Sequence, residues 1–183
     1  MISVNGFRLS GPDGPVFGPI DAEIGKGQLV AVVGPGGSGR SSLLMALAGR
    51  LQGGEGKGPE PDVRDVTSLA RITGVVETDE HRKVGRLLRD QGLSGRLPGD
   101  QDQRYGELST ADKLRVDVGL ALASGASAIF VDDVDDGLVP ADLKRAWAYL
   151  RKVADSGVSV VASACAAPSD VDRVIDLGAG TDG

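Results

Sequence analysis

The sequence predicts an α/β fold in which helices cover both faces of a mainly parallel β-sheet. Short apolar runs bounded by glycine or proline alternate with longer stretches in which apolar residues recur at helical spacing. The chain has 183 residues, of which 40% are hydrophobic, so it can bury a sizeable core in one domain with a small insertion. The individual segments, taken in order, support this layered arrangement.

The first half of the chain predicts a strand, a glycine-rich loop and a helix in succession. Residues 28–34 (QLVAVVG) are almost continuously apolar, as in a buried strand, and residues 41–51 (SSLLMALAGRL) have the apolar spacing of a helix. Residues 52–65 (QGGEGKGPEPDVRD) are rich in glycine, proline and charge, and predict an exposed loop. Residues 70–76 (ARITGVV) predict the next strand.

The second half continues the alternation of helices and strands. We expect one short helix within 83–97, and a helix over 109–125 whose N-cap is Ser109 or Thr110. The remaining segments are a strand at 127–133 (SAIFVDD), a helix at 140–157, and strands at 158–164 and 171–177. The candidate for a second unit is the insertion of residues 78–106, which leaves residues 1–77 and 107–183 as the core.

The composition favours a cytoplasmic protein that does not bind nucleic acid. The formal net charge is -6, and the basic residues form no cluster typical of a nucleic-acid-binding face. Cys165 is the only cysteine, so no internal disulfide can form. The first residues lack the pattern of a signal peptide, and no apolar run approaches the roughly 20 residues that span a bilayer.

Residues 34–41 (GPGGSGRS) follow the pattern G-x-x-x-x-G-K-[ST] of phosphate-binding loops, except that Arg40 replaces the lysine. In such loops, backbone N–H groups surround phosphate oxygens, and the start of the following helix attracts the same anion. The guanidinium keeps the positive charge but is broader and planar, so we expect binding to survive better than the geometry of phosphoryl transfer. The candidate nucleotide-binding residues are Gly34, Gly36, Gly37, Ser38, Gly39, Arg40, Ser41 and Ser42. The alternative is a glycine-rich turn that binds nothing.

Two carboxylates at the end of the 127–133 strand could complete such a site. Asp132, at the end of a buried strand, is placed to hold Mg²⁺ through water, together with the Ser41 hydroxyl. Asp133 would then lie next to the terminal phosphate. The alternative is that DDVDD is only an acidic, solvated turn after a strand.

The two motifs and the spacing between them resemble the nucleotide-binding domain of the ATP-binding cassette (ABC) superfamily, over about residues 16–177. FGPIDAEIGKGQLVAVVGPGGSGRSSLLMALAG is similar to the first strands, phosphate loop and helix of that family. GELSTADKLRVDVGLALASGASAIFVDD is similar to its signature segment, helix and metal-binding strand, without a gap. The resemblance implies a P-loop NTPase-like three-layer sandwich with a mixed, mainly parallel sheet, and a reduced helical subdomain at residues 78–106.

The resemblance also assigns roles to single positions. The signature LSGGQ, which caps the nucleotide of an opposite subunit, falls on residues 108–112 (LSTAD) and retains Ser109. The metal-sensing glutamine falls on Glu77, and the catalytic glutamate on Asp133, which is one methylene shorter. The switch histidine falls on Ala164, while His81 lies elsewhere and is expected on the surface.

Two further positions concern the base and the dimer. The adenine-stacking aromatic of the family falls near Ser10 or Leu9, neither of which can stack as tyrosine does. Residues 136–138 (DGL) resemble the turn through which two such domains meet.

Taken together, the resemblance implies a cytoplasmic subunit that binds ATP or GTP with Mg²⁺. It also implies a homodimer or heterodimer of such domains and a membrane-protein partner that holds them at the inner face of the membrane. The changed positions predict that hydrolysis is slow or absent, because two lost interactions of about 2 kcal/mol each would slow turnover about a thousandfold.

Three other interpretations remain open at this point. One is a fully active transporter ATPase whose altered residues are compensated locally. A second is an interaction protein that keeps the fold without nucleotide. A third is a nucleotide kinase, whose lid would account for the arginines of residues 78–106, namely Arg82, Arg86, Arg89, Arg96 and Arg104.

Overall fold

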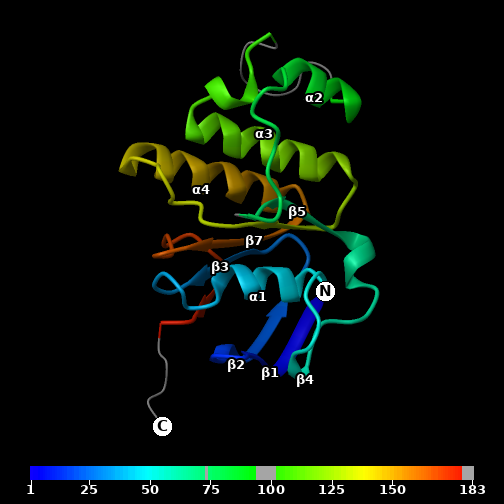
Figure 1. Cartoon of the computed structure of the whole chain (residues 1–183), viewed down its shortest axis with the longest axis vertical. Coiled ribbons are helices and arrows are strands. Elements are labelled where there is room, and N and C mark those ends of the chain that lie inside the picture. Colours follow the sequence, from blue (N-terminus) through cyan, green and yellow to red (C-terminus); the bar gives the residue numbers. More distant parts are fainter. Residues whose placement is uncertain (73, 94–101, 179–183) are drawn as a thin grey trace.

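The computed structural model describes residues 1–72, 74–93 and 102–178, which form a layered α/β structure (Figure 1). Its centre is a five-stranded parallel sheet, which confirms the predicted fold class. In the order in which they pair, the strands are β5 (Thr67–Arg71), β6 (Ala128–Val131), β7 (Ser159–Ala164), β3 (Leu29–Val33) and β8 (Arg173–Asp176). The predicted apolar runs became β3, β6 and β7, whose residues are all buried.

A second, antiparallel sheet is formed by β1 (Ile2–Gly11), β2 (Gly14–Ile24) and β4 (Glu55–Lys57), with β1 in the middle. The prediction of an exposed loop over 52–65 was therefore wrong for the β4 residues, which are exposed but pair with β1. At Gly56, φ is +82°, and a Cβ would lie 2.3 Å from the carbonyl oxygen of Gly6. The close approach of the two backbones accounts for a strand made of residues with little to bury.

The described residues contain the α-helices α1 (Arg40–Leu47), α2 (Val84–Asp90), α3 (Thr110–Ala123) and α4 (Pro140–Asp155), of which α1, α3 and α4 flank the parallel sheet. Figure 1 shows α3 and α4 on one face of the parallel sheet, and α1 on the other face, between the two sheets. One apolar cluster joins α1 to both sheets, and another joins α3 and α4 to the parallel sheet. Within the described residues, no helix is long and apolar enough to cross a membrane.

The strand predicted at residues 70–76 has different bounds in the structure. Strand β5 starts earlier, at Thr67, and ends at Arg71. The N–H groups of Val75 and Val76 then both donate to the carbonyl oxygen of Ile72, at 3.0 and 2.9 Å. This turn, with Gly74 at a φ of +72°, ends the strand, so Glu77 follows a turn.

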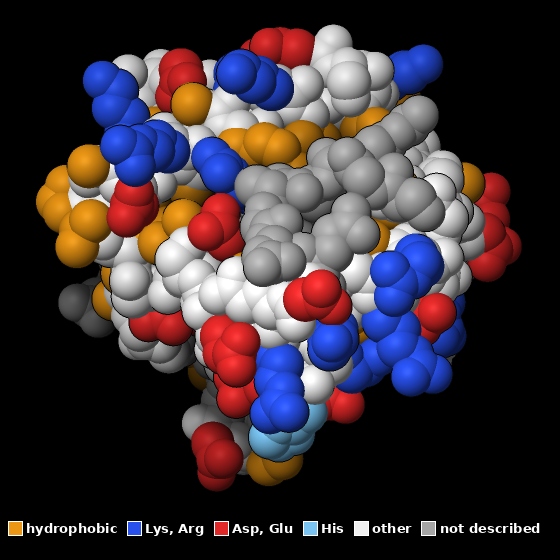
Figure 2. Space-filling model, turned by 90° about the horizontal axis from the view of Figure 1, so that it is seen from above, with side chains coloured by type: hydrophobic (Ala, Val, Ile, Leu, Met, Phe, Trp, Pro, Cys, Tyr) orange, Lys and Arg blue, Asp and Glu red, His pale blue; other side chains and the backbone are white. Residues whose placement is uncertain are grey.

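Helix α2 lies on the outer side of α3 and corresponds to the helix expected within 83–97, of which residues 94–97 lie outside the described residues. A small apolar cluster, separate from the two larger ones, contains Leu88 of α2, Val116 of α3 and Tyr105 between them. The division into a core and an insertion at 78–106 stays a prediction. Figure 2 shows this end of the molecule, where basic and acidic side chains are interspersed over the described part of the surface.

Candidate functional site

The predicted site lies at the edge of the parallel sheet where the strands end. The glycine loop follows β3, Asp132 and Asp133 follow β6, and Cys165 follows β7. Because β7 pairs in parallel with both β3 and β6, these three ends reach the same edge. This is the edge at which ligands bind in open α/β sheets.

The glycine loop is shaped by backbone contacts that require glycine. Gly39 has a φ of +86°, and a Cβ on it would lie 2.2 Å from the carbonyl oxygen of Val16. Helix α1 starts directly after it, so the first N–H groups of the helix lack partners within the helix. Gly36 and Gly37 are exposed, whereas Ser41 and Ser42 are half-buried in the first turn of α1. The loop is therefore open on its outer side and able to receive an anion.

Asp132 is buried in a way that favours a bound cation. The residue is 0% exposed, its Oδ1 accepts a hydrogen bond from the Ser163 hydroxyl, and its Oδ2 has no hydrogen-bond partner in the described part of the chain. Ser38 Oγ is a second buried oxygen without such a partner. A buried carboxylate oxygen without a partner is rare, and a water molecule bound to Mg²⁺ would satisfy it.

A magnesium ion at this place would need ligands from outside the protein. Within the described ranges, no three His, Cys, Asp or Glu side chains lie close enough together to hold a metal ion. The predicted Asp132 and Ser41 would share the ion with water and phosphate oxygens, which is the usual arrangement for Mg²⁺. The residues present therefore fit a metal that arrives with a nucleotide.

Arg40 does not project away from the protein. Its Nη2 donates to Asp133 Oδ1 at 2.7 Å, and its Nη1 donates to the carbonyl oxygen of Gly34. The same Nη1 lies 3.6 Å from Cys165 Sγ. Only 12% of the Arg40 side chain is exposed. One guanidinium thus connects the glycine loop with the ends of β6 and β7.

Asp133 is held in an uncommon backbone conformation. Its φ is 44°, a region that asparagine and aspartate enter more readily than other non-glycine residues, and its N–H donates to Ser163 Oγ at 2.8 Å. Partial burial and the adjacent charge of Asp132 raise the pKa of the Asp133 carboxyl, although the Arg40 cation opposes this shift. The carboxylate is therefore placed beside Arg40 by the backbone.

Two hollows border these residues on the protein surface. One of about 330 Å³ is lined by Arg40, Asp133, Asp135, Asp136, Gly137 and Cys165. The other, of about 320 Å³, includes Gly37 and Ser38 of the loop together with Val16, Phe17 and Asp176. The Phe17 ring packs against Phe7 in the core, with ring centroids 5.6 Å apart, and Phe17 is only 5% exposed. A nucleotide base in this second hollow would meet both polar and apolar groups, and the buried Phe17 offers it no exposed ring to stack on.

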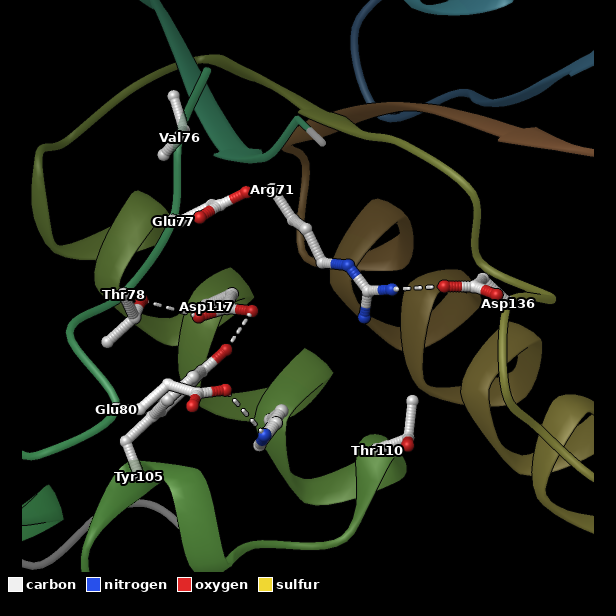
Figure 3. A pocket seen from close by; sticks show the side chains of 10 residues that line it. Arg71, Val76, Glu77, Thr78, Glu80, Tyr105, Thr110, Asp117 and Asp136 are labelled. Atoms are coloured by element: carbon white, nitrogen blue, oxygen red, sulfur yellow. Dashed lines mark hydrogen bonds and ion pairs between the residues drawn. The ribbon is translucent and has the colours of Figure 1, made fainter. Parts of the chain in front are cut away.

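Glu77 lies in a different hollow, of about 350 Å³, beside Arg71 and Asp117 (Figure 3). It is exposed, and its Oε1 accepts a hydrogen bond from the N–H of Gly74 at 3.1 Å. The residues around the 330 Å³ hollow at Arg40 do not include Glu77. Its predicted contact with the metal ion stays a prediction.

Ser109 is the N-cap of α3, which settles the choice between Ser109 and Thr110. Its Oγ accepts a hydrogen bond from the Asp112 N–H at 3.1 Å and donates to Asp112 Oδ2 at 2.8 Å. The hydroxyl borders a small hollow of about 130 Å³ and not the glycine loop. Its predicted role toward the nucleotide of another subunit stays a prediction.

The sequence did not single out Asp117, which is a buried polar centre between α3 and the segment before α2. The residue is 3% exposed and accepts hydrogen bonds from Thr78 Oγ1 at 2.8 Å and from the Tyr105 hydroxyl at 2.7 Å (Figure 3). Burial raises the pKa of the Asp117 carboxyl, and these two hydrogen bonds act in the opposite direction. The sequence signal that could have indicated this buried carboxylate is the position of an acidic residue between Val116 and Val118.

The raised pKa of Asp117 gives a pH-dependent contribution to stability. Below the ordinary aspartate pKa, the carboxyl is protonated in both the folded and unfolded states, so the shift has no effect. As the pH rises through the folded-state pKa, the folded protein must release a proton that it holds more tightly, and stability falls. We expect the free energy of unfolding of the wild type, minus that of Asp117→Asn, to decrease from pH 4 toward neutral pH. Urea unfolding of both proteins over this pH range measures the difference. A difference that increases with pH would contradict a raised pKa of Asp117.

The chain is similar in sequence to proteins of transport systems. A family model described as "ABC transporter" matches residues 17–135. The chain is 28% identical to ABC transporter G family member 12 of Dictyostelium discoideum over 81% of its own length, but it spans only 29% of that protein. It is 24% identical to a high-affinity branched-chain amino acid transport ATP-binding protein of Pseudomonas aeruginosa, covering 77% of this chain and 72% of that one.

Solved structures share the fold. A putative ABC transporter ATP-binding protein from Pyrococcus furiosus superposes with a TM-score of 0.77 at 19% identity, covering 96% of both chains. An ATP-binding cassette solved as a dimer in a post-hydrolysis state with ADP and Pi superposes with a TM-score of 0.72 at 16% identity, covering 97% of this chain and 94% of that one.

Proposed function

The chain belongs to the ABC transporter family, and from this premise we propose that it binds Mg-ATP at the glycine loop and hydrolyses it slowly or not at all as a homodimer. The observation that carries the proposal is Asp132 Oδ2, a buried carboxylate oxygen without a hydrogen-bond partner among the described residues. Asp132 is the first residue after β6, and the next residue, Asp133, forms the ion pair with Arg40. The bound Mg²⁺ would supply charge neutralisation for the phosphate oxygens.

Three observations support slow hydrolysis. Arg40 is already bonded to Asp133 and Gly34, so its charge is directed at protein groups. Asp133 is shorter than the glutamate expected at its position and would have to leave Arg40 to orient a water molecule. Ala164 is 0% exposed and carries no imidazole. Each change removes or redirects a group that would stabilise the transition state.

The wider role that we propose is that of the ATP-binding part of a membrane transporter, held at the inner face of the membrane by a partner. The support comes from the relatives, several of which are named as transporters or as ATP-binding proteins of transport systems. A dimer is supported by the neighbour that was solved as one. In a heterodimer, the altered site could bind ATP while a second subunit supplies hydrolysis.

We expect Asp132→Asn to remove the effect of Mg²⁺ on ATP binding. The amide keeps the size of the side chain and can still accept from Ser163, but it loses the charge that attracts the hydrated cation, so the gain in ATP affinity on adding Mg²⁺ should fall by about tenfold or more. Isothermal titration calorimetry of ATP with Mg²⁺, and with a chelator in its place, measures this gain.

The matched control is Asp136→Asn, which removes one charge from the same sheet edge at a side chain that is 77% exposed. It should leave the effect of Mg²⁺ in place. The absence of any ATP binding by the folded wild type at millimolar concentration would exclude the proposed function and favour an interaction protein.

A further inference from the structure

The ion pair between Arg40 and Asp133 has a consequence for how the site takes up its ligand. We propose that this pair is an autoinhibitory contact: a polyphosphate must displace Asp133 from Arg40 before the cation can bind the phosphate. The inference rests on the proposed function and concerns the regulation of the same site. It predicts that the charge of Asp133 weakens nucleotide binding.

Arg40 directs both of its terminal nitrogens at groups of the protein. One side of the guanidinium bonds Asp133 Oδ1 at 2.7 Å, while Nη1 is shared between the Gly34 carbonyl oxygen and the Cys165 sulfur. The guanidinium makes these contacts from two nitrogens held in a rigid plane, whereas lysine carries its three donors on a single nitrogen. The contact in this geometry therefore depends on arginine at the position of the usual lysine.

The contact between Arg40 and Asp133 is partly shielded from water. The Arg40 side chain is 12% exposed and the Asp133 side chain is 28% exposed, whereas most other ion pairs of the described chain include a partner that is more than half exposed. Surface pairs contribute little because water and salt screen them. The Arg40–Asp133 pair is less screened, so separating the two charges without a replacement is costly.

The backbone at Asp133 is held in place on both sides, so a small backbone movement does not separate its carboxylate from Arg40. Its φ of 44° is fixed between the buried Asp132 and Val134, and its N–H is bonded to Ser163 Oγ, which also donates to Asp132. The two charges can therefore separate by rotation of the Asp133 or the Arg40 side chain, without a movement of the backbone at Asp133. In the bonded position, it neutralises the cation and adds negative charge where a phosphate would approach.

The variant Asp133→Asn tests the proposal. Asparagine has nearly the same size, also tolerates a left-handed backbone and can still accept a hydrogen bond, so the fold should persist while the charge is lost. We expect the affinities for tripolyphosphate and for Mg-ATP, measured by calorimetry, to rise about tenfold. Tripolyphosphate isolates the phosphate site from any contribution of the base.

The matched control is again Asp136→Asn, which removes the same charge from the hollow that contains Arg40 and Asp133, but at a residue that forms an ion pair with Arg71. If the effect is only a general reduction in negative potential, both variants will gain affinity equally, and the proposal is wrong. A gain confined to Asp133→Asn supports it. Arg40→Lys has all its donors on one nitrogen and should hold Asp133 less firmly, so it should also gain affinity, and it carries the test if Asp133→Asn does not fold.

The outcomes separate this proposal from the function on which it rests. Binding of Mg-ATP by the wild type with no change in Asp133→Asn supports the function and overturns the autoinhibitory contact. Binding by Asp133→Asn alone supports the contact and shows that the wild type is not itself an ATP-binding protein. If wild type, Asp133→Asn and Arg40→Lys are all folded and none binds either ligand, both proposals are overturned.

Discussion

ATP turnover is expected to rise about a thousandfold when Arg40→Lys and Asp133→Glu are combined in one protein. Lysine presents a compact charge that can reach the phosphates, and it lacks the second terminal nitrogen from which Arg40 contacts both Asp133 and the Gly34 carbonyl oxygen. Glutamate extends the carboxylate by one methylene toward the attacking water. If each change restores about 2 kcal/mol of transition-state stabilisation, the two give a factor of about a thousand. Phosphate release at saturating Mg-ATP measures the gain.

The backbone conformation at position 133 makes the Asp133→Glu change costly in stability. A glutamate there must adopt a φ of 44°, which we expect to cost about 1 kcal/mol of stability and to be visible as a lower melting temperature. Adding Asp132→Asn to the double variant is the control, because it should abolish the gained turnover by removing the metal-binding charge. Rapid phosphate release from the unmodified protein would contradict the proposed slow hydrolysis and favour the fully active alternative.

The elements that the sequence predicted well are those that carry their own signal. Strands β3, β6 and β7 are buried on both faces, and each therefore appears as an unbroken apolar run. Helix α4 begins with Pro140 and ends just before Gly157, which are the expected residues at those positions. In these cases, local chemistry and tertiary structure favour the same conformation.

One element was missed because it depends on a partner far away in the chain, and one boundary was misplaced because a local turn interrupts the apolar pattern. Strand β4 consists of exposed residues, and it forms because the backbone of β1 offers hydrogen bonds to a segment about fifty positions later. The end of β5 was misplaced because the apolar pattern continues past Arg71 while the backbone turns at Gly74. Neither feature can be derived from the spacing of apolar residues.

The same distinction applies to the site. Arg40 and Asp133 were each identified as positions next to the phosphates, but they are 93 residues apart, and their mutual bond depends on the order of strands in the sheet. Ser163 and Cys165 were not identified as residues of the site. They reach the site because β7 pairs between β3 and β6, a fact of topology that the sequence alone did not show.

The glycine loop allows folding and binding to be separated by two substitutions of the same kind. Gly39→Ala is expected to lower the free energy of unfolding by about 2–4 kcal/mol, because the new methyl would lie 2.2 Å from the Val16 carbonyl oxygen and the residue would keep a φ of +86°. The atom that the methyl would meet belongs to the Val16 backbone, so no flexible side chain can move aside to relieve the contact. Urea unfolding measures the loss, and a change below about 0.5 kcal/mol would mean that the loop relaxes freely.

Gly36→Ala should leave the stability unchanged and weaken nucleotide binding. A methyl at Gly36 meets no protein atom within 4 Å and φ lies outside the left-handed region, so stability should stay within about 0.5 kcal/mol of the wild type. The open space beside Gly36 is where a polyphosphate would contact the loop, and a methyl there should weaken Mg-ATP binding by about tenfold or more. Calorimetry on the folded variant measures the loss. Unchanged affinity would place the phosphates away from this loop, and because the stability of the variant is preserved, misfolding could not explain the result.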